Sequence, residues 1–183
     1  MANYCTTKIT LIGDNENLKK LYNKIDNRDF FNLESYPTLF ENTENNSEFD
    51  WGSKWQRIDE IDFVEEFAQD MYIYGDSAWS PAKGLWRKIS KEYNLEITLD
   101  YSEPGCNFGG TISFTNGEIT HEVEMTFYEY LYKNDGDYFW DEVEMLLENE
   151  SVEDVIKILG DLYTQMPDYD KEKLNSMGNA YEE

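Results

Sequence analysis

Apolar and polar residues alternate with a period of two along several short stretches of the chain, which predicts β-strands. The first runs from Tyr4 to Ile12, where Cys5, Thr7, Ile9 and Leu11 share one face. The clearest runs from Leu95 to Tyr101. We also expect a strand around Met71 to Tyr74, where the composition is rich in β-forming residues.

A hairpin is predicted further along the chain. Thr111 to Thr115 and Ile119 to Phe127 flank Asn116-Gly117. Asn-Gly is the dipeptide preferred in two-residue hairpin turns. The preceding turn, Glu103-Pro104-Gly105, leads into a Gly-rich segment ending at Gly110. It matches no phosphate-binding fingerprint, so we interpret it as a bulged strand entry that needs positive φ.

Stretches with helical periodicity lie between these strands and after them. A helix is predicted after Gly13-Asp14, and Asp14 can cap its N-terminus. Its apolar face is formed by Leu18, Leu21, Tyr22 and Ile25. Ser80-Pro81 predicts a second helix, with Ser80 as N-cap and a buried stripe formed by Leu85, Trp86, Ile89 and Tyr93. Two closing helices are expected at Tyr138 to Glu148 and at Val152 to Tyr163, the second opened by Ser151.

This order of elements predicts an α+β fold, in which helices cover one side of a mainly antiparallel sheet. We expect an α+β domain over residues 1–127, with an acidic, polar insertion near 27–50. A C-terminal helical extension should follow over 128–166. Residues 167–183 are polar and aperiodic, so we expect a flexible tail there.

The amino-acid composition makes some classes of function unlikely for this chain. Fifteen Lys and Arg against 39 Asp and Glu give a formal net charge of -24, while 16% of the residues are aromatic. The aromatic content predicts a folded chain, and the charge disfavours binding of nucleic acid through a basic surface. Cys5 and Cys106 show no metal-binding or redox spacing, and no leader or membrane-spanning segment is apparent. We therefore expect a protein of a reducing cytoplasm.

Three motifs in order resemble a known family. They are Trp51-Gly52-Ser53-Lys54-Trp55, Ser77-Ala78-Trp79-Ser80-Pro81 and Tyr101-Ser102-Glu103-Pro104-Gly105-Cys106-Asn107-Phe108-Gly109-Gly110. Together with the opening Ala2-Asn3-Tyr4-Cys5, they resemble the YubB-like proteins of plasmids and phages over roughly residues 3 to 125. The resemblance implies a ferredoxin-like domain and an origin in a mobile genetic element. It implies no biochemical activity.

A row of carboxylates is the main candidate for function. Asp137, Asp141, Glu144 and Glu148 are spaced i, i+4, i+7 and i+11, which places them on one face of the predicted helix. Apolar residues occupy the opposite face: Phe139, Trp140, Val143, Leu146 and Leu147. Such a row presents negative charge much as a nucleic-acid backbone does. The alternative is an ordinary solvated helix face.

Catalytic and metal-binding interpretations find less support. Asn134-Asp135-Gly136-Asp137 faintly resembles a calcium loop, but that register would put Leu131 and Lys133 where oxygen ligands are needed. His121, the only histidine, alternates with Ile119, Val123 and Met125, and we expect it on a buried face. The tryptophans at 51, 55, 79 and 86 are interpreted mainly as core. We expect no catalytic residue and no cofactor.

The sequence thus predicts an inhibitor from a mobile element that binds stoichiometrically to a basic host protein, such as a CRISPR effector nuclease, by imitating nucleic acid. The expected partner-binding residues are Glu41, Glu44, Glu48, Asp50, Asp135, Asp137, Asp141, Glu144, Glu148 and Glu150. Two alternatives stay open. One is an interaction module that docks through apolar contacts, and the other is a hydrolase dependent on a divalent metal.

Overall fold

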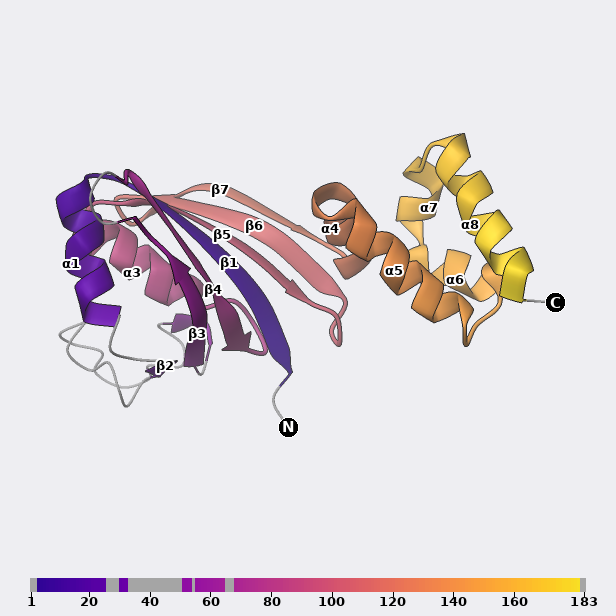
Figure 1. Ribbon diagram of the computed structural model, residues 1–183, viewed down its shortest axis with the longest axis horizontal. Helices are drawn as coiled ribbons and strands as arrows, with labels where there is room; N and C mark the ends of the chain where they lie inside the picture. The colour runs from indigo at the N-terminus through magenta and orange to yellow at the C-terminus, as the bar shows by residue number, and fades with distance from the viewer. Residues whose placement is uncertain (1–2, 26–29, 33–50, 54, 65–67, 182–183) are drawn as a thin grey trace. The chain divides into compact units, whose positions relative to one another are not determined.

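The computed structural model describes residues 3–25, 30–32, 51–53, 55–64 and 68–181. The chain divides into two compact units, residues 1–124 and residues 125–183, and each has its own hydrophobic core. The first is an α+β unit and the second is helical (Figure 1). Among the described helices, none has the length and apolar character that crossing a membrane requires.

A seven-stranded sheet forms the first unit, in the order β2-β3-β4-β1-β5-β6-β7. Its strands are β1 Tyr4–Ile12, β2 Phe30–Asn32, β3 Trp55–Asp62, β4 Asp70–Ala78, β5 Glu96–Glu103, β6 Phe108–Thr115 and β7 Glu118–Met125. Strand β1 lies in the middle and pairs antiparallel with β4 and β5. The neighbours β3-β4-β1-β5, with a helix after β1 and another after β4, give the ferredoxin-like arrangement expected from the sequence.

Burial follows the predicted alternation along β1. Cys5, Thr7, Ile9 and Leu11 are buried, while the intervening residues are mostly exposed. Helices α1 (Asn15–Ile25) and α3 (Lys83–Tyr93) pack against each other and against the sheet, covering the buried face (Figure 1). The core joins both layers and includes Leu18, Leu21, Ile73, Leu85, Trp86, Ile89, Leu99 and Phe114.

The hairpin between β6 and β7 is confirmed. Asn116 and Gly117 have φ values of 51° and 78°, as a turn with two left-handed residues requires. The second strand ends earlier than predicted, because Thr126 caps a helix that begins at Phe127. The Thr126 hydroxyl accepts the Glu129 backbone N–H, and the Glu129 carboxylate accepts the Thr126 N–H in return.

Three predictions for the first unit need correction. Helix α3 begins at Lys83, not at Ser80-Pro81, and its N-cap is Ala82 without a side-chain cap. The Ser80 hydroxyl instead donates to the Gly52 carbonyl. Strand β3 is an element that the sequence did not predict, and β2 lies within the expected insertion at 27–50. The rest of that insertion, residues 27–29 and 33–50, lies outside the described residues.

Five helices make up the second unit: α4 Phe127–Asn134, α5 Gly136–Leu147, α6 Val152–Leu159, α7 Asp161–Gln165 and α8 Asp168–Tyr181. The predicted helix at 138–148 is confirmed as α5. The one at 152–163 is divided at Gly160, where φ is 56°. The predicted flexible tail is wrong for most of its length. Residues 168–181 form helix α8, which buries Leu174 in the core of this unit.

Candidate functional site

Helix α5 carries the predicted row of carboxylates. Asp135 caps the helix, and its side chain accepts the Tyr138 backbone N–H at 3.1 Å. Phe139, Val143 and Leu147 anchor the opposite face in the core, as the sequence predicts. The anchored face leaves four acids exposed in one row, which we call the α5 carboxylate row: Asp137, Asp141, Glu144 and Glu148. At a rise of 1.5 Å per residue, the row spans about 16 Å.

No lysine or arginine of the described part of the chain forms an ion pair with the α5 carboxylate row. Its one hydrogen-bonded neighbour across the unit is Tyr181 of α8, which donates to the Glu144 carboxylate at 2.8 Å. That hydrogen bond raises the pKa of the Tyr181 phenol. Residues 125–183 hold 16 of the 39 acids but only 4 of the 15 Lys and Arg. The row therefore lies in the more densely negative part of the chain.

The other predicted partner-binding residues divide into two groups. Asp135 and Glu150 are exposed at the two ends of α5, beside the α5 carboxylate row. Glu41, Glu44, Glu48 and Asp50 lie outside the described residues. The structure thus brings six of the ten predicted acids together on one helix and its flanks.

The three motifs that suggested the family resemblance converge at one end of the sheet, which we call the motif end. The Ser53 hydroxyl donates to the Ala78 carbonyl at 2.9 Å, and the Trp79 N–H donates to the Asn3 carbonyl at 3.0 Å. The Asn3 amide in turn lies 3.8 Å from the Cys106 sulfur. Residues far apart in sequence are therefore tied together by hydrogen bonds here.

Trp79 is the exception among the tryptophans interpreted as core. Trp51 and Trp86 are buried as expected, but Trp79 is 50% exposed. Its φ of 67° lies in the left-handed region, which bulky residues rarely adopt. Two backbone hydrogen bonds hold this geometry. The Trp79 N–H donates to the Asn3 carbonyl, and the Ser80 N–H donates to the Ala78 carbonyl. The motif end thus presents an indole on a strained backbone.

The Gly-rich segment is a structural turn. The buried Glu103 carboxylate accepts the N–H groups of Gly105 and Cys106, so those amides are already occupied. Positive φ occurs at Asn107 and not at a glycine, which corrects our interpretation. Gly110 is needed for a different reason. A Cβ there would lie 2.3 Å from the Val123 carbonyl of the neighbouring strand.

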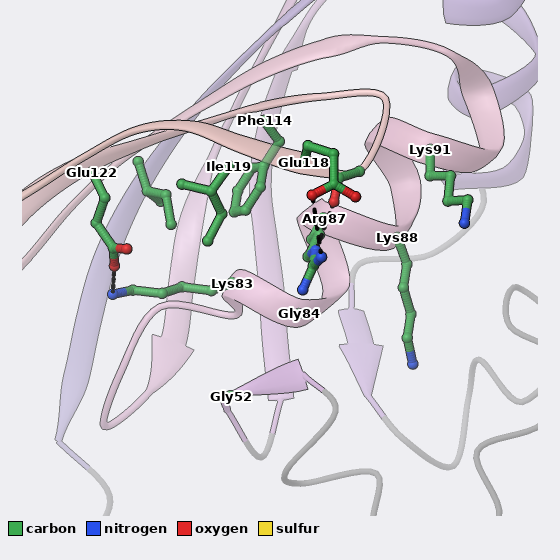
Figure 2. Close-up of a pocket in the computed structure, with 12 residues that line it drawn as sticks. Gly52, Lys83, Gly84, Arg87, Lys88, Lys91, Phe114, Glu118, Ile119 and Glu122 are labelled. Carbon is green, nitrogen blue, oxygen red and sulfur yellow. Dashed lines mark hydrogen bonds and ion pairs between the residues drawn. The ribbon is translucent and has the colours of Figure 1, made fainter.

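A groove beside α3 is a feature that the sequence analysis missed. Its volume is about 550 Å³, and we call it the α3–β7 groove. Its lining includes Lys83, Arg87, Lys88 and Lys91 of α3, Glu118, Ile119 and Glu122 of β7, and Ile112 and Phe114 of β6 (Figure 2). The spacing of Lys83, Arg87 and Lys91 by four residues was visible in the sequence and could have indicated a cationic helix face.

Two ion pairs cross this groove. The Lys83 ammonium lies 2.8 Å from Glu122, and Arg87 lies 3.8 Å from Glu118 while its Nε donates to the Gly117 carbonyl at 2.6 Å. Burial is the largest single influence on Lys83 and lowers its pKa, but the hydrogen bond to Glu122 and the interactions with Tyr101 together outweigh burial and raise the pKa. Figure 2 shows Lys88 and Lys91 beyond Arg87, away from Glu122.

In the part of the chain that the structure describes, the histidine and the two cysteines lie apart from one another. His121 is exposed on β7, so the predicted buried position is wrong; every position of β7 from Glu118 to Glu124 is exposed. Burial raises the pKa of the Cys5 thiol to about 12, and Cys106 is a separate, exposed free thiol. Within the described ranges, no cluster of three or more His, Cys, Asp or Glu residues could hold a metal ion.

Comparison with known proteins supports the fold. Residues 50–137 match the family described as a ferredoxin-like domain in Api92-like protein. A crystal structure of protein api92 from Yersinia pseudotuberculosis is 20% identical, with a TM-score of 0.37, over 43% of this chain and 28% of that one. No curated protein matches the sequence. The resemblance expected from the motifs is thus confirmed at the level of a ferredoxin-like domain, and over residues 50–137 the chain is similar to that of Api92-like proteins.

Proposed function

We propose that this chain is a stoichiometric inhibitor that binds a basic, nucleic-acid-binding protein through the α5 carboxylate row. The proposal extends to a mobile-element origin and to a host defence nuclease, such as a CRISPR effector, as the partner. The observation that carries it is the row itself: four exposed carboxylates in line on one helix, without an ion pair to any described lysine or arginine.

Electrostatics supply the mechanism. The groove of a nucleic-acid-binding protein is lined with cations that neutralise phosphates, and a rigid row of carboxylates can occupy the same cations. A net charge of -24 would accelerate the encounter with such a surface. The anchors Phe139, Val143 and Leu147 hold the helix in one orientation, so the row needs no ordering when it binds.

The test compares two variants of equal charge. In the first, Asp137→Asn, Asp141→Asn, Glu144→Gln and Glu148→Gln neutralise the row. In the control, Asp14→Asn, Glu16→Gln, Glu92→Gln and Glu96→Gln neutralise four exposed acids of the first unit. Inhibition of DNA cleavage by a CRISPR effector nuclease is measured at several salt concentrations. At about 0.5–1 kcal/mol per exposed charge contact, the row variant should inhibit at least tenfold more weakly.

The control variant should inhibit nearly as well as the unmodified chain, and inhibition should weaken as salt rises. Equal loss in both variants would mean that net charge acts without a site. Inhibition by the unmodified chain that does not change with salt would contradict imitation of nucleic acid. If the chain inhibits no nuclease but its row binds another basic protein, the partner class is wrong while the binding surface stands.

The exposed Trp79 favours a second candidate, an interaction module that docks through the motif end. Tryptophan is the residue type most enriched at the energetic centres of protein interfaces, and this one is held out on a strained backbone. Under this alternative, Trp79→Ala would weaken partner binding while neutralisation of the α5 carboxylate row would leave it unchanged. Under the first proposal, neutralisation of the α5 carboxylate row would weaken binding and Trp79→Ala would leave it unchanged.

A further inference from the structure

The solvent-facing side of helix α5 carries apolar side chains as well as acids. Tyr138 is 45% exposed and Met145 is 60% exposed, although both belong to a helix that buries Phe139 and Val143 in the core. The two residues are seven positions apart, which places them on one side of the helix, about 10 Å from each other along its axis. We call them the Tyr138–Met145 strip.

The strip lies directly beside the α5 carboxylate row. At about 100° per residue, Met145 is about 40° from Asp141 around the helix axis, and Tyr138 is about 60° from it. Glu142 lies about 40° beyond Tyr138, on the far side of the strip. A hydrogen bond to Glu142 is the first of the causes that raise the pKa of the Tyr138 phenol, so these two side chains are in contact. Acids therefore border the strip on both sides.

This arrangement is typical of a protein interface. Tyrosine and methionine are enriched at the centres of interfaces, whereas aspartate and glutamate are depleted there and charged residues lie at the rim. Single exposed apolar residues are common on any protein surface, but the strip places two of them in line within a surface that is otherwise acidic. The flexible side chain of Met145 also suits a surface that must adapt to a partner.

Charge complementarity defines the occupant. The acids on both sides of the strip require cations at the margins of the partner surface, and the strip requires apolar side chains between those cations. An amphipathic helix supplies both, because apolar residues at i, i+3, i+4 and i+7 form one stripe and lysines or arginines can lie beside it. Two helices that cross at about 20° run nearly parallel, so one such helix can cover Tyr138 and Met145 together.

We infer that this face of α5 binds a basic amphipathic helix, whose apolar stripe covers the Tyr138–Met145 strip while its lysines or arginines meet the α5 carboxylate row and Glu142. The inference rests on the proposed function and narrows it, because the basic partner then contributes a helix with an apolar stripe and not a surface of cations alone.

The experiment uses two synthetic peptides as probes and measures their binding to the full chain by fluorescence anisotropy. In the first peptide, leucine repeats with helical period among lysines. In the second, glutamine replaces every leucine, so the two peptides have equal length and charge. Binding is measured at about 0.15 M and about 1 M sodium chloride, between which the Debye length shortens from about 8 Å to about 3 Å.

The strip variant is Tyr138→Gln with Met145→Gln, because glutamine removes the apolar surface and is a good helix former. The matched control is Ile158→Gln with Tyr169→Gln, which also removes one tyrosine and one other apolar residue, both exposed, from α6 and α8 of the same unit. The variant with a neutralised α5 carboxylate row is measured beside them. Thermal unfolding verifies that all three variants fold.

At about 1 M salt, the unmodified chain should bind the leucine peptide at least tenfold more tightly than the glutamine peptide. The strip variant should lose this preference, and the control variant should keep it. The variant with a neutralised row should bind both peptides more weakly at about 0.15 M salt. Equal binding of the two peptides by the unmodified chain, or equal loss of the preference in the strip and control variants, would overturn the inference.

The inference and the proposed function can fail separately. If the two peptides bind equally but neutralising the row still weakens inhibition of a nuclease, the inference fails and the proposed function stands. If the leucine peptide is preferred through the strip but the chain inhibits no nuclease, the proposed partner class is wrong and the helix-binding face stands.

Discussion

Trp79 shows how a single residue can be held in an unfavourable conformation by its neighbours. A positive φ costs a non-glycine residue roughly 1–2 kcal/mol. The chain could avoid this cost with glycine, as it does at Gly52 and Gly117. Instead the chain has a half-exposed indole at this position. The Trp79 N–H donates to the Asn3 carbonyl, and the adjacent Ala78 carbonyl accepts the Ser53 hydroxyl. An exposed indole retained at such a position is better explained by binding than by packing.

The first prediction separates the backbone cost from the side-chain role. Trp79→Gly and Trp79→Ala both remove the indole, but only glycine adopts positive φ without strain. The glycine variant should therefore be about 1 kcal/mol more stable than the alanine variant, as measured by urea unfolding. The same pair of substitutions at Trp86, which lies in helix α3, should show the opposite order, with alanine more stable. A more stable alanine variant at 79 would contradict the strain.

At the scale of elements, helices α4 and α8 are joined by a buried polar contact. The Tyr132 hydroxyl donates to the Asp170 carboxylate, which is only 5% exposed. Burial, followed by this hydrogen bond, raises the pKa of Tyr132 from 10.0 to about 12. Asp170 depends on this donor, since a buried carboxylate without a partner is costly. The contact helps to hold α8 against the bundle.

The second prediction concerns Tyr132→Phe. The loss of a hydrogen bond to a buried carboxylate should destabilise the second unit by about 1–3 kcal/mol near pH 7. Because the folded pKa is raised, the stabilisation from the neutral phenol is complete below pH 10 and is lost as the pH rises towards 12. The Tyr132→Phe variant should therefore lose less stability between pH 10 and pH 12 than the unmodified chain. Unfolding followed by far-ultraviolet circular dichroism measures this. Tyr128→Phe, also in α4, is the control, and an equal effect there would contradict the role of Asp170.

Elements with a regular pattern were predictable from the sequence, and those with an interrupted pattern were not. Strand β1 and the β6–β7 turn follow simple alternation and turn chemistry. Strand β3 escaped prediction because a bulge between Ile58 and Glu60 shifts its register and breaks the alternation. Helix α8 has few apolar residues, and it buries Asp170 through a distant tyrosine that no local pattern reveals.

Of the candidate sites too, only the one with a regular sequence pattern was predictable. The α5 carboxylate row was predictable because its members lie on one helix and obey one period. The motif end and the α3–β7 groove combine residues that are far apart in the chain, such as Ser53 with Ala78, 25 positions apart, and Asn3 with Cys106, 103 positions apart. Their proximity depends on strand pairing, so only the structure could reveal it.

For the whole molecule, the distribution of charge matters more than its sum. Residues 1–124 and 125–183 each carry a formal charge of -12, but the second unit has less than half the length of the first. Within the first unit, helix α3 holds four cations and one acid. The molecule therefore has a cationic groove in one unit and a densely acidic helix in the other.

The third prediction follows from self-repulsion among the acids. Added salt shortens the Debye length from about 30 Å at 0.01 M to about 3 Å at 1 M. Screening should raise the thermal midpoint, by about 2–4 °C for each kcal/mol of relieved repulsion. Differential scanning calorimetry in sodium chloride would measure this. The variant with a neutralised α5 carboxylate row should gain less from salt, and an unchanged midpoint in both proteins would contradict the repulsion.

Strand β7 terminates the sheet among the described residues, and every position from Glu118 to Glu124 is exposed. A bare strand of this kind is a template on which another chain could add a strand and begin aggregation. Glu118 and Glu122 on that edge are paired with Arg87 and Lys83, but residues 1–124 carry a formal charge of -12, and a second copy would approach with the same charge. The acidity that is proposed to attract a basic partner thus also acts as a guard, keeping copies of this protein from joining edge to edge.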